Sequence, residues 1–567
     1  MEKFSEIKYV RPDYSGTKKT LAKLTKVLKN AESYDEFKQA YLQIEELVKI
    51  IYTANSICHV RNTLDVNDEY YDKENIVNGK ESSKLSIALL KTYKVLLGSK
   101  YRKDFDKEFG SFISKSLEAQ LKLISKKILL DQIKENKLTQ QYAKDSALCK
   151  TNFRGEECNF YGLLKHMQST DQQERKEAFE AWSALYESVS SKLDDTYTKL
   201  VKNRVKQAKK LGFNNYIDMA YLNRGRFDYT VQDAANFREA VRTYIVPLCV
   251  ELRNRQAKRL GLNSIKFYDE SLMFKEGNAL PIGDKNELVN KAKKMYEEMS
   301  KESGEFFNFM IENDLFDLDT RVGKRMGGYT TFFPSYNAPF IFSNFNGTSA
   351  DIDVLTHEAG HAFQAYLASR TLPISEQIHS TSEINEIHSM SMEHFAYPWM
   401  ELFFGDKANK YLYTHLVDSI LTIPYLVSVD EFQHRVFENP KMNAMDRRKV
   451  WHDIEVKYLP WRDYDGNKFL EEGGFWMQKQ HIFLYPFYYI EYALAQICAY
   501  QFFIRSRKDK AEAWDSYIKL CKLGGSLGYF DLLKAVDLKN PFDENNIKYI
   551  VDEIKNIINE FEIKLEH

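Results

Sequence analysis

Proline, glycine and an excess of either charge are scarce in this sequence. Its 567 residues include only 12 Pro and 24 Gly, and no Pro/Gly/Ser-rich linker divides the chain. The length allows several domains, but the absence of linkers favours one large body or two tightly docked ones. The formal net charge of -1 excludes the basic footprint of a nucleic-acid-binding protein, so we expect no nucleic-acid partner.

Cysteine is also sparse and forms no framework. The six cysteines are scattered over the chain without a CxxC pair, which indicates reduced, buried thiols. The N-terminal stretch MEKFSEIKYVRPDYSG lacks the apolar core and the small-residue cleavage site of a secretory signal. Both features predict a cytoplasmic protein.

One apolar run, residues 482–504, is long enough to cross a bilayer. It carries Glu491, Gln496, Gln501 and five tyrosines, which is unusual for a membrane span. We therefore interpret the run as a buried helix that lines something polar, and we expect no membrane partner.

Helical periodicity dominates the sequence from residue 13 to about residue 300. Apolar residues recur at i, i+3, i+4 and i+7, and Gly212 and Gly261 are placed as helix-terminating glycines. Residues 321–348, RVGKRMGGYTTFFPSYNAPFIFSNFNGT, are instead rich in aromatic and β-branched residues. The predicted fold is mainly α, with one small β-sheet directly before a histidine-containing helix.

That helix contains the motif HEAGH, with His357 and His361 four positions apart and Glu358 beside the first histidine. Thr348 or Ser349 is the predicted helix cap. Residues one turn apart bring two imidazoles to a common metal ion, and the intervening glutamate can reach a water on an open coordination position. The alternative is a packed or solvated histidine pair without a metal. A zinc site needs a third ligand.

The segment HSTSEINEIHSMSMEHFAYPWM offers candidates for that ligand. Ser380 and Glu383 stand in capping-box register, and the helix is expected to stop near Pro398. Spacing alone does not choose a ligand, and most helical glutamates face solvent. The candidates are Glu383, Glu386, His388, Glu393 and His394.

LTHEAGHAFQAY followed by INEIHSMSMEHF resembles the thimet oligopeptidase and oligoendopeptidase F family of zinc metallopeptidases. GKRMGGY and APFIFSNFNGT resemble the family's approach to its metal helix. The resemblance implies Glu386 as third zinc ligand, 29 residues after His357, and Glu393 as a supporting carboxylate. It also implies substrate contacts at Gly328 and Phe340.

The resemblance further implies the family's fold and organisation. We expect a large helical body with a deep substrate channel that excludes folded proteins. The expected regions are an N-terminal helical region, residues 1–185, and a catalytic region, residues 186–567.

Aromatic residues follow a helical pattern in QKQHIFLYPFYYIEYALAQ. Tyr485, Tyr488 or Tyr489, and Tyr492 recur at i, i+3/i+4 and i+7, with His481 one turn earlier. An aromatic core stripe is the plain interpretation, although four polar tips are many for a core. The resemblance implies that His481, Tyr485, Tyr489 and Tyr492 bind substrate or stabilise the attacked carbonyl oxygen. Ile490 and Glu491 replace a common family glycine, so which tyrosine serves the oxyanion stays open.

We therefore expect a zinc-dependent endopeptidase acting on short unstructured peptides, with one zinc ion per chain. Glu358 is the expected proton acceptor for the attacking water, and His481 and Tyr492 are the expected catalytic donors. Asp353 and Glu393 are candidates to accept an imidazole N–H. The strand-like segment APFIFSNF is expected to pair with the extended substrate by edge addition.

Two alternatives are compatible with the same motifs. A helical zinc carboxypeptidase or dipeptidyl carboxypeptidase needs a cation near the metal, and the sequence does not show whether Arg325 is so placed. A catalytically silent peptide-binding protein of the same fold is disfavoured, because Glu358 and all three ligands occur together. The oligomeric state, monomer or homodimer, is left open.

Overall fold

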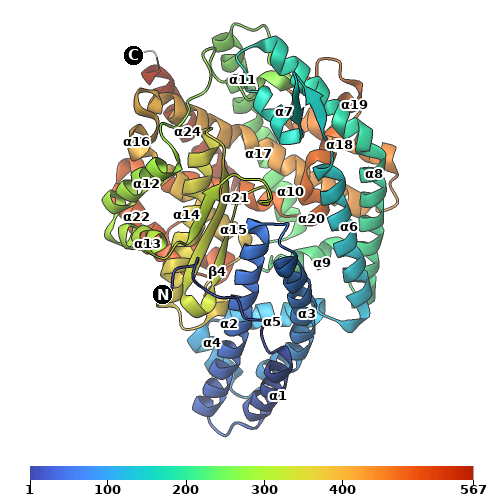
Figure 1. Cartoon of the computed structure of the whole chain (residues 1–567), viewed down its shortest axis with the longest axis vertical. Helices are drawn as coiled ribbons and strands as arrows, with labels where there is room; N and C mark the ends of the chain where they lie inside the picture. The colour runs from blue at the N-terminus through green and yellow to red at the C-terminus, as the bar shows by residue number, and fades with distance from the viewer. Residues whose placement is uncertain (566–567) are drawn as a thin grey trace. The chain divides into compact units, whose positions relative to one another are not determined.

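The computed structural model describes residues 1–565, and it is mainly helical with small sheets, as predicted (Figure 1). Residue contacts divide the chain into two compact units. Unit 1 contains Met1–Lys126, Leu280–Ala408 and Cys498–Lys539, and unit 2 contains Lys127–Ala279, Asn409–Ile497 and the chain from Asn540 onward. The expected regions 1–185 and 186–567 and the expected channel stay predictions.

Unit 1 begins with helices that pack around a common apolar core. Side chains of Asp13, Ser33 and Asp68 accept hydrogen bonds from the first turns of the longer helices, which satisfies otherwise unpaired N–H groups. The core of this bundle includes the fully buried Phe37 and Phe105. The helices are α1 (Tyr14–Asn30), α2 (Tyr34–Leu64), α3 (Glu69–Leu97), α4 (Arg102–Phe109) and α5 (Ser111–Leu123).

The remainder of unit 1 surrounds a three-stranded sheet within the described residues. The strand order is β3–β5–β4, with β5 parallel to β3 and antiparallel to β4. Its strands are β3 (Phe316–Asp319), β4 (Tyr329–Phe333) and β5 (Ala338–Phe345). Its helices are α12 (Lys285–Met299), α13 (Lys301–Glu312), α14 (Ala350–Thr371), α15 (Ser382–Phe395), α16 (Met400–Phe404), α22 (Lys510–Leu523) and α23 (Tyr529–Ala535).

The predicted helix caps of this region are wrong in detail. Ser349 precedes α14 but makes no capping hydrogen bond, and the carboxylate of Asp351 accepts from the backbone N–H groups of residues 346 and 347 instead. α15 begins after Thr381, again without a side-chain cap, so the Ser380–Glu383 capping box does not form. The helices themselves are present, because tertiary packing stabilises them more than caps do.

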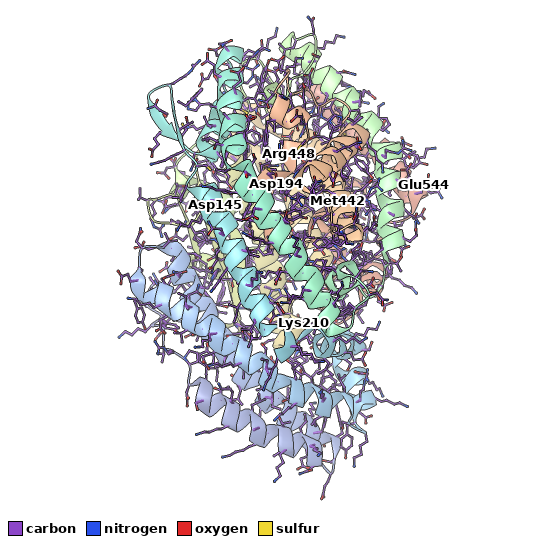
Figure 2. All side chains as sticks on the ribbon, turned by 90° about the vertical axis from the view of Figure 1, so that its right-hand side faces the viewer. Asp145, Asp194, Lys210, Met442, Arg448 and Glu544 are labelled. Atoms are coloured by element: carbon purple, nitrogen blue, oxygen red, sulfur yellow. The ribbon has the colours of Figure 1, made fainter. Side chains whose placement is uncertain are left out.

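Unit 2 is built around long helices, of which α6 (Leu129–Ala147) and α8 (Gln172–Leu211) run side by side (Figure 2). Asp194 on α8 is buried and pairs with Arg447 and Arg448 at 3.2 Å each. Both guanidinium groups come from α18 (Ala444–Tyr458). The other helices of at least eight residues that belong wholly or mostly to unit 2 are α9 (Tyr216–Asn223), α10 (Val231–Ala240), α11 (Val246–Leu260), α17 (Ala408–Glu438) and α24 (Glu544–Lys564). α21 (Tyr489–Lys508) belongs to unit 2 up to Ile497 and to unit 1 from Cys498.

Two glycine terminators of unit 2 are confirmed. Gly212 and Gly261 follow α8 and α11 with φ of 87° and 73°, a region that favours glycine. A short antiparallel hairpin, β1 (Thr151–Phe153) and β2 (Glu156–Cys158), was not predicted. The hairpin turns at Arg154 and Gly155, both with positive φ. Gly155 was a local turn signal in a stretch that otherwise has helical periodicity.

The long apolar run at residues 482–504 is interrupted. α20 (Gln480–Leu484) ends before Pro486, and α21 begins at Tyr489. Glu491 is fully buried and pairs with Arg224 and Arg226, which explains a carboxylate inside an apolar segment. Among the described residues, one helical stretch is long and apolar enough to span a bilayer, and it is Ser382–Glu438 rather than this run; 61% of its most apolar window is buried.

Candidate metal centre and its surroundings

Helices α14 and α15 carry the metal-ligand candidates and lie against each other, next to β4 (Figure 1). Their contact is closest at Gly360, the glycine of the HEAGH motif. A Cβ atom on Gly360 would lie 2.6 Å from the Cα of Ser389 and 2.8 Å from the carbonyl oxygen of His388. Only glycine permits this approach. No role was predicted for Gly360, although its place between the two histidines was a signal.

The close approach brings three donors together. Oε2 of Glu386 lies 3.3 Å from Nε2 of His357 and 3.5 Å from Nε2 of His361. These donor atoms all lie within 4.8 Å of one another. Two imidazoles and one carboxylate are the donor set of many catalytic zinc sites, so the residues present fit a metal ion. The grouping includes the Glu386 that the family resemblance implied.

The other candidates on α15 do not join this group. Glu383, His388 and His394 are buried at 1%, 0% and 3% exposure, but none belongs to the donor group. Spacing could not separate these side chains from Glu386, because α15 is buried on several of its faces. The sequence alone does not indicate which of these faces is directed at the metal.

Glu393 supports the centre from two turns further along α15. Its Oε1 lies 2.6 Å from Nδ1 of His357, on the opposite side of the ring from Glu386. A carboxylate at Nδ1 orients a ligating imidazole and leaves Nε2 for the metal. Asp353, the other predicted partner for an imidazole N–H, lies on α14 one turn before His357, and its role stays a prediction.

Charge at the centre is strongly polarised. Burial opposes the positive charge of a protonated His357. Hydrogen bonds to Glu386 and Glu393 outweigh this effect and hold the pKa of His357 well above its ordinary value. Burial likewise opposes ionisation of Glu386, but the neighbouring His361 and His357 hold the pKa of its carboxyl well below the ordinary value. Glu386 is therefore an ionised carboxylate within a buried site, as a cation ligand must be.

Glu358 is held by the sheet. The hydroxyl of Thr330 on β4 donates to Oε2 of Glu358 at 2.6 Å, and Glu358 is 8% exposed. Gly328, directly before β4, lies near the second oxygen of this carboxylate, since a Cβ atom on Gly328 would stand 3.7 Å from Oε1 of Glu358. Thr330 was missed by the sequence analysis, because its contact with Glu358 spans 28 residues and two elements.

Two predictions about the sheet need correction. β5, which contains APFIFSNF, is the central strand, so both of its edges are already paired and it cannot accept a substrate strand. The side chain of Phe340 is 1% exposed and packs against Phe4 and Phe333, which leaves it no surface for a substrate. Residues 338–343 are all buried, so both faces of β5 are covered along this stretch and Phe340 has no exposed neighbours on it. β4, in contrast, is an edge strand.

Comparisons with known proteins agree with this geometry. Residues 165–550 match the model of peptidase family M3, and residues 4–124 match the peptidase M3 N-terminal domain. The chain belongs to peptidase family M3. It is a metallopeptidase of that family, and the resemblance to oligoendopeptidase F is confirmed.

Solved M3 structures are similar over almost the whole chain. PZ peptidase A, solved with an inhibitor, is 43% identical with a TM-score of 0.94, and the match covers 98% of this chain and 99% of that one. A Bacillus anthracis structure named as an oligoendopeptidase F is 40% identical with a TM-score of 0.90, covering 99% and 98%. An oligoendopeptidase F homolog of Borreliella burgdorferi is 27% identical over 409 residues, 69% of this chain and 67% of that protein.

In unit 2 of this M3 peptidase, the predicted histidine and tyrosines form a ring cluster around His481. The ring centroids of Tyr485, Tyr488, Tyr489 and Tyr492 lie 5.8, 5.9, 4.7 and 6.4 Å from that of His481. Tyr489 is buried, and burial raises the pKa of its hydroxyl. Tyr485 is 47% exposed.

The prediction that these rings share one continuous helical face is wrong. The backbone leaves the helix between α20 and α21, where Pro486 precedes Phe487 with φ of 64°. Arg226 donates to the carbonyl oxygen of Phe487, and the N–H of Phe487 donates to Oε1 of Gln433 at 2.7 Å. These partners satisfy the interrupted backbone. Pro486 was the signal for this break.

Arg224 ties the turn to α21. Its guanidinium lies 4.5 Å from the ring centroid of Tyr488 and donates to Glu491 from Nε at 2.8 Å. Glu491 therefore has a structural role in unit 2. It anchors the segment that presents Tyr488 and Tyr492.

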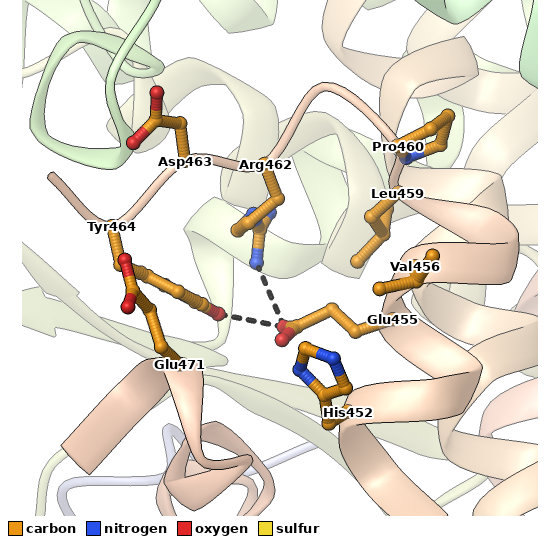
Figure 3. Close-up of a pocket in the computed structure, with 9 residues that line it drawn as sticks. All are labelled: His452, Glu455, Val456, Leu459, Pro460, Arg462, Asp463, Tyr464 and Glu471. Atoms are coloured by element: carbon orange, nitrogen blue, oxygen red, sulfur yellow. Dashed lines mark hydrogen bonds and ion pairs between the residues drawn. The ribbon is translucent and has the colours of Figure 1, made fainter. Parts of the chain in front are cut away.

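Unit 2 also contains a cavity of about 340 Å³ beside α18 (Figure 3). Glu455 points into it, with Oε1 accepting from the Tyr464 hydroxyl at 2.6 Å and lying 3.8 Å from Nη1 of Arg462. Burial raises the pKa of the Glu455 carboxyl to about 6, although Arg462 and Tyr464 partly oppose this. A carboxyl of this kind titrates close to neutral pH.

Proposed function

We propose that this M3 peptidase is a zinc-dependent endopeptidase that hydrolyses internal bonds of short unstructured peptides. The observation that carries the proposal is the convergence of His357, His361 and Glu386, with Glu358 beside them and held by Thr330. Three protein donors and a neighbouring carboxylate are the arrangement of catalytic rather than structural zinc.

His357, His361 and Glu386 would hold one zinc ion. When bound, zinc supplies Lewis-acid polarisation of a carbonyl and makes a water more acidic. Glu393 fixes the ring of His357 through Nδ1, which would direct Nε2 at the ion once that nitrogen has lost its proton. The ionised Glu386 offsets part of the ion's charge inside a buried site.

Glu358 is the proposed proton carrier. It accepts a proton from the attacking water and passes that proton to the leaving amine, a role suited to a carboxylate adjacent to a ligand on the same helix. Thr330 supports this role, since its hydroxyl occupies one oxygen of Glu358 and leaves the other for the water.

The edge of β4 is the proposed site for the substrate backbone. An extended peptide adds to an edge strand through main-chain hydrogen bonds, and such recognition makes little use of side-chain identity. Gly328 supports the proposal, because it lies beside Glu358 and has no side chain to obstruct an approaching peptide. Sequence preference is then broad.

The proposed donors to the attacked carbonyl oxygen are His481 and Tyr492, with Tyr485 and Tyr489 as substrate contacts. Their ring cluster supports a shared task, and it adds Tyr488, whose centroid lies 5.0 Å from that of Tyr492. The same proposal includes one zinc ion at this centre, short peptides as the substrates, no nucleic-acid or membrane partner, and a cytoplasmic location. The oligomeric state, monomer or homodimer, stays open.

The test is cleavage of a ladder of unstructured peptides about 5 to 40 residues long, mapped by mass spectrometry. Wild type is compared with Glu358→Gln and with Glu401→Gln, which changes an exposed glutamate on α16. We expect internal cuts by wild type and Glu401→Gln, and a loss of about 10²–10⁴-fold in kcat for Glu358→Gln.

The other outcomes separate the alternatives. Release of residues only from free C-termini would replace the endopeptidase by a carboxypeptidase or dipeptidyl carboxypeptidase. Equal cutting by wild type and Glu358→Gln would refute the role of Glu358. Peptide binding without cutting by zinc-loaded wild type would leave a peptide-binding protein.

A further inference from the structure

The unpredicted hairpin of unit 2 places a second set of metal-binding side chains close together. β1 and β2 pair in antiparallel register, with Thr151 opposite Cys158 and Phe153 opposite Glu156. Glu156 and Cys158 are two residues apart on β2 and share one face of the strand. The short helix α7 (Phe160–His166) follows and ends at His166.

His166 returns to the hairpin, and the three side chains meet. One donor atom from each of Glu156, Cys158 and His166 lies within 4.8 Å of the others. In the described part of the chain, only the His357 group has the same property. Cys158 is 5% exposed, whereas Glu156 is exposed and His166 is half-buried, so the group runs from a buried thiol to a solvent-accessible carboxylate.

Glu174 orients the histidine. Its Oε1 lies 2.6 Å from Nδ1 of His166, and its Oε2 accepts from the Ser169 hydroxyl at 2.9 Å. This hydrogen bond leaves Nε2 of His166 as the ring nitrogen available to a metal. Glu393 and His357 form the same pair at the catalytic centre. Carboxylate partners of this kind are typical of ligating histidines.

We propose that Glu156, Cys158 and His166 bind a second metal ion, a thiolate-accepting transition metal such as Zn²⁺, which clips the hairpin to α7. Donors sharing one tetrahedral zinc lie roughly 3.3–3.8 Å apart, given Zn–N and Zn–S bonds of about 2.0 and 2.3 Å. Closure by about 1 Å brings the three side chains to that spacing. Binding releases the Cys158 thiol proton to solvent, and water completes the coordination.

The sulfur donor makes this site spectroscopically distinct. The centre on α14 and α15 has only nitrogen and oxygen donors, so cobalt bound there gives no thiolate-to-cobalt charge-transfer band. Metal-free full-length protein is titrated with Co²⁺ while the near-ultraviolet absorption is recorded. Cys158→Ser and His166→Ala test the site. Cys149→Ser is the matched control, because Cys149 is also buried and lies just before the hairpin.

We expect the charge-transfer band in wild type and Cys149→Ser, and its loss in Cys158→Ser. His166→Ala is expected to weaken cobalt binding at this site at least tenfold. A wild type without the band, or a band that persists in Cys158→Ser, would overturn the proposal. Either result leaves the catalytic centre untouched, because Cys158 and His166 have no part in it.

Zinc content gives an independent readout. After equilibration with Zn²⁺ and gel filtration, we expect two ions per wild-type chain and one in the His357→Ala/His361→Ala double variant. Adding Cys158→Ser to the double variant should remove the last ion. A double variant without zinc would contradict a second site.

Proteolysis tests the clip itself. Arg154 is exposed at the hairpin turn, so trypsin can cut there when the hairpin opens. Zn²⁺ at about ten times its Kd is expected to slow this cut roughly tenfold in wild type. The cut in Cys158→Ser should not respond to Zn²⁺. Equal responses of both proteins would show that the ion acts elsewhere.

Discussion

The α14–α15 pair in unit 1 and the α20–α21 segment in unit 2 carry the two groups of candidate site residues, and they are built in opposite ways. In the first, regular helices hold the donors, and the close approach at Gly360 brings those helices together. In the second, the helix breaks at Pro486, and the rings gather around His481 across the break. Spacing in the sequence predicts which side chains lie together only where the backbone is regular.

The means of stabilisation differ as well. Around His357 the contacts are imidazole–carboxylate pairs, whose geometry is defined by hydrogen bonds. Around the break at Phe487, the buried Arg226 donates to the backbone and pairs with Glu491. Removing one member of a buried ion pair costs several kcal/mol, so both regions depend on charged groups whose partners are distant in sequence.

The irregular segment provides the largest expected effect. We predict that Tyr492→Phe lowers kcat by about 10²–10³-fold with little change in KM, because it removes the proposed donor to the developing oxyanion. Tyr485 is 47% exposed, and Tyr485→Phe should cost less than about tenfold, since uniform binding contacts contribute less to kcat. Steady-state kinetics on one internally cleaved peptide measures both. Equal losses of kcat in the two variants would mean that Tyr492 has no special role as the oxyanion donor.

The regular pair is tested at its closest contact. Gly360→Ala should lower the free energy of unfolding by about 3 kcal/mol, because its Cβ would meet backbone atoms of α15 at 2.6–2.8 Å. Metal affinity should fall with it, as Glu386 moves away from the histidines. Urea unfolding and competition with a chelator provide the measurements.

Gly79→Ala is the matched control for that substitution. Gly79 lies within α3, and a Cβ there would meet nothing within 4 Å. The helix gains stability of about 0.5–1 kcal/mol from this change. If both alanines stabilised the protein, the close approach of α14 and α15 would not be needed.

Glu393→Gln removes the carboxylate that orients His357. We expect the affinity of the catalytic centre for zinc to fall about 10–100-fold, the usual effect of losing an outer partner of a metal-ligating histidine. Glu401→Gln, a change of an exposed glutamate, should leave the affinity unaltered. Metal titration in the Cys158→Ser background isolates this centre. An unchanged zinc affinity in Glu393→Gln would mean that a group other than Glu393 orients His357.

Buried carboxylates extend the comparison, since the pKa of Glu386 is lowered and that of Glu455 is raised to about 6. For Glu455 the folded protein binds the proton more tightly than the unfolded chain. Its contribution to stability is therefore present at low pH and is lost as the pH rises through about 6. Between pH 5 and pH 7 this amounts to about 1 kcal/mol.

Glu455→Gln should remove that pH dependence, and urea unfolding at both pH values measures it. The difference in stability between wild type and Glu455→Gln is expected to shift in favour of wild type as the pH falls. Glu471→Gln changes an exposed carboxylate that lines the same cavity, and it should keep the wild-type slope. Parallel slopes in all three proteins would show that Glu455 stays ionised across this range.

Part of the candidate site could be predicted from local pattern alone. His357 and His361 belong to one helix, so four residues of spacing suffice to place their rings together. Glu386 required the family resemblance, because its neighbours Glu383 and His388 are buried as well. Phe340 and the pairing of β5 were predicted wrongly, because strand order and the buried face of a strand depend on partners outside the strand.

Thr330, Gly360 and the Glu156–Cys158–His166 group show what lies beyond such patterns. Each depends on contacts between separate elements: a strand with a helix, two helices, or a hairpin with a following helix. The short hairpin itself was masked by helical periodicity on both sides.

The sequence by itself determined the helical class, the near-neutral surface, the histidine pair and the family, because periodicity, charge and local spacing are properties of neighbouring residues. Only the tertiary structure decided how the contact at Gly360 brings Glu386 to the histidines, which strands lie at the edges of the sheet and where the tyrosine helix breaks. These features are set by close packing between distant segments, whose energies no local pattern contains.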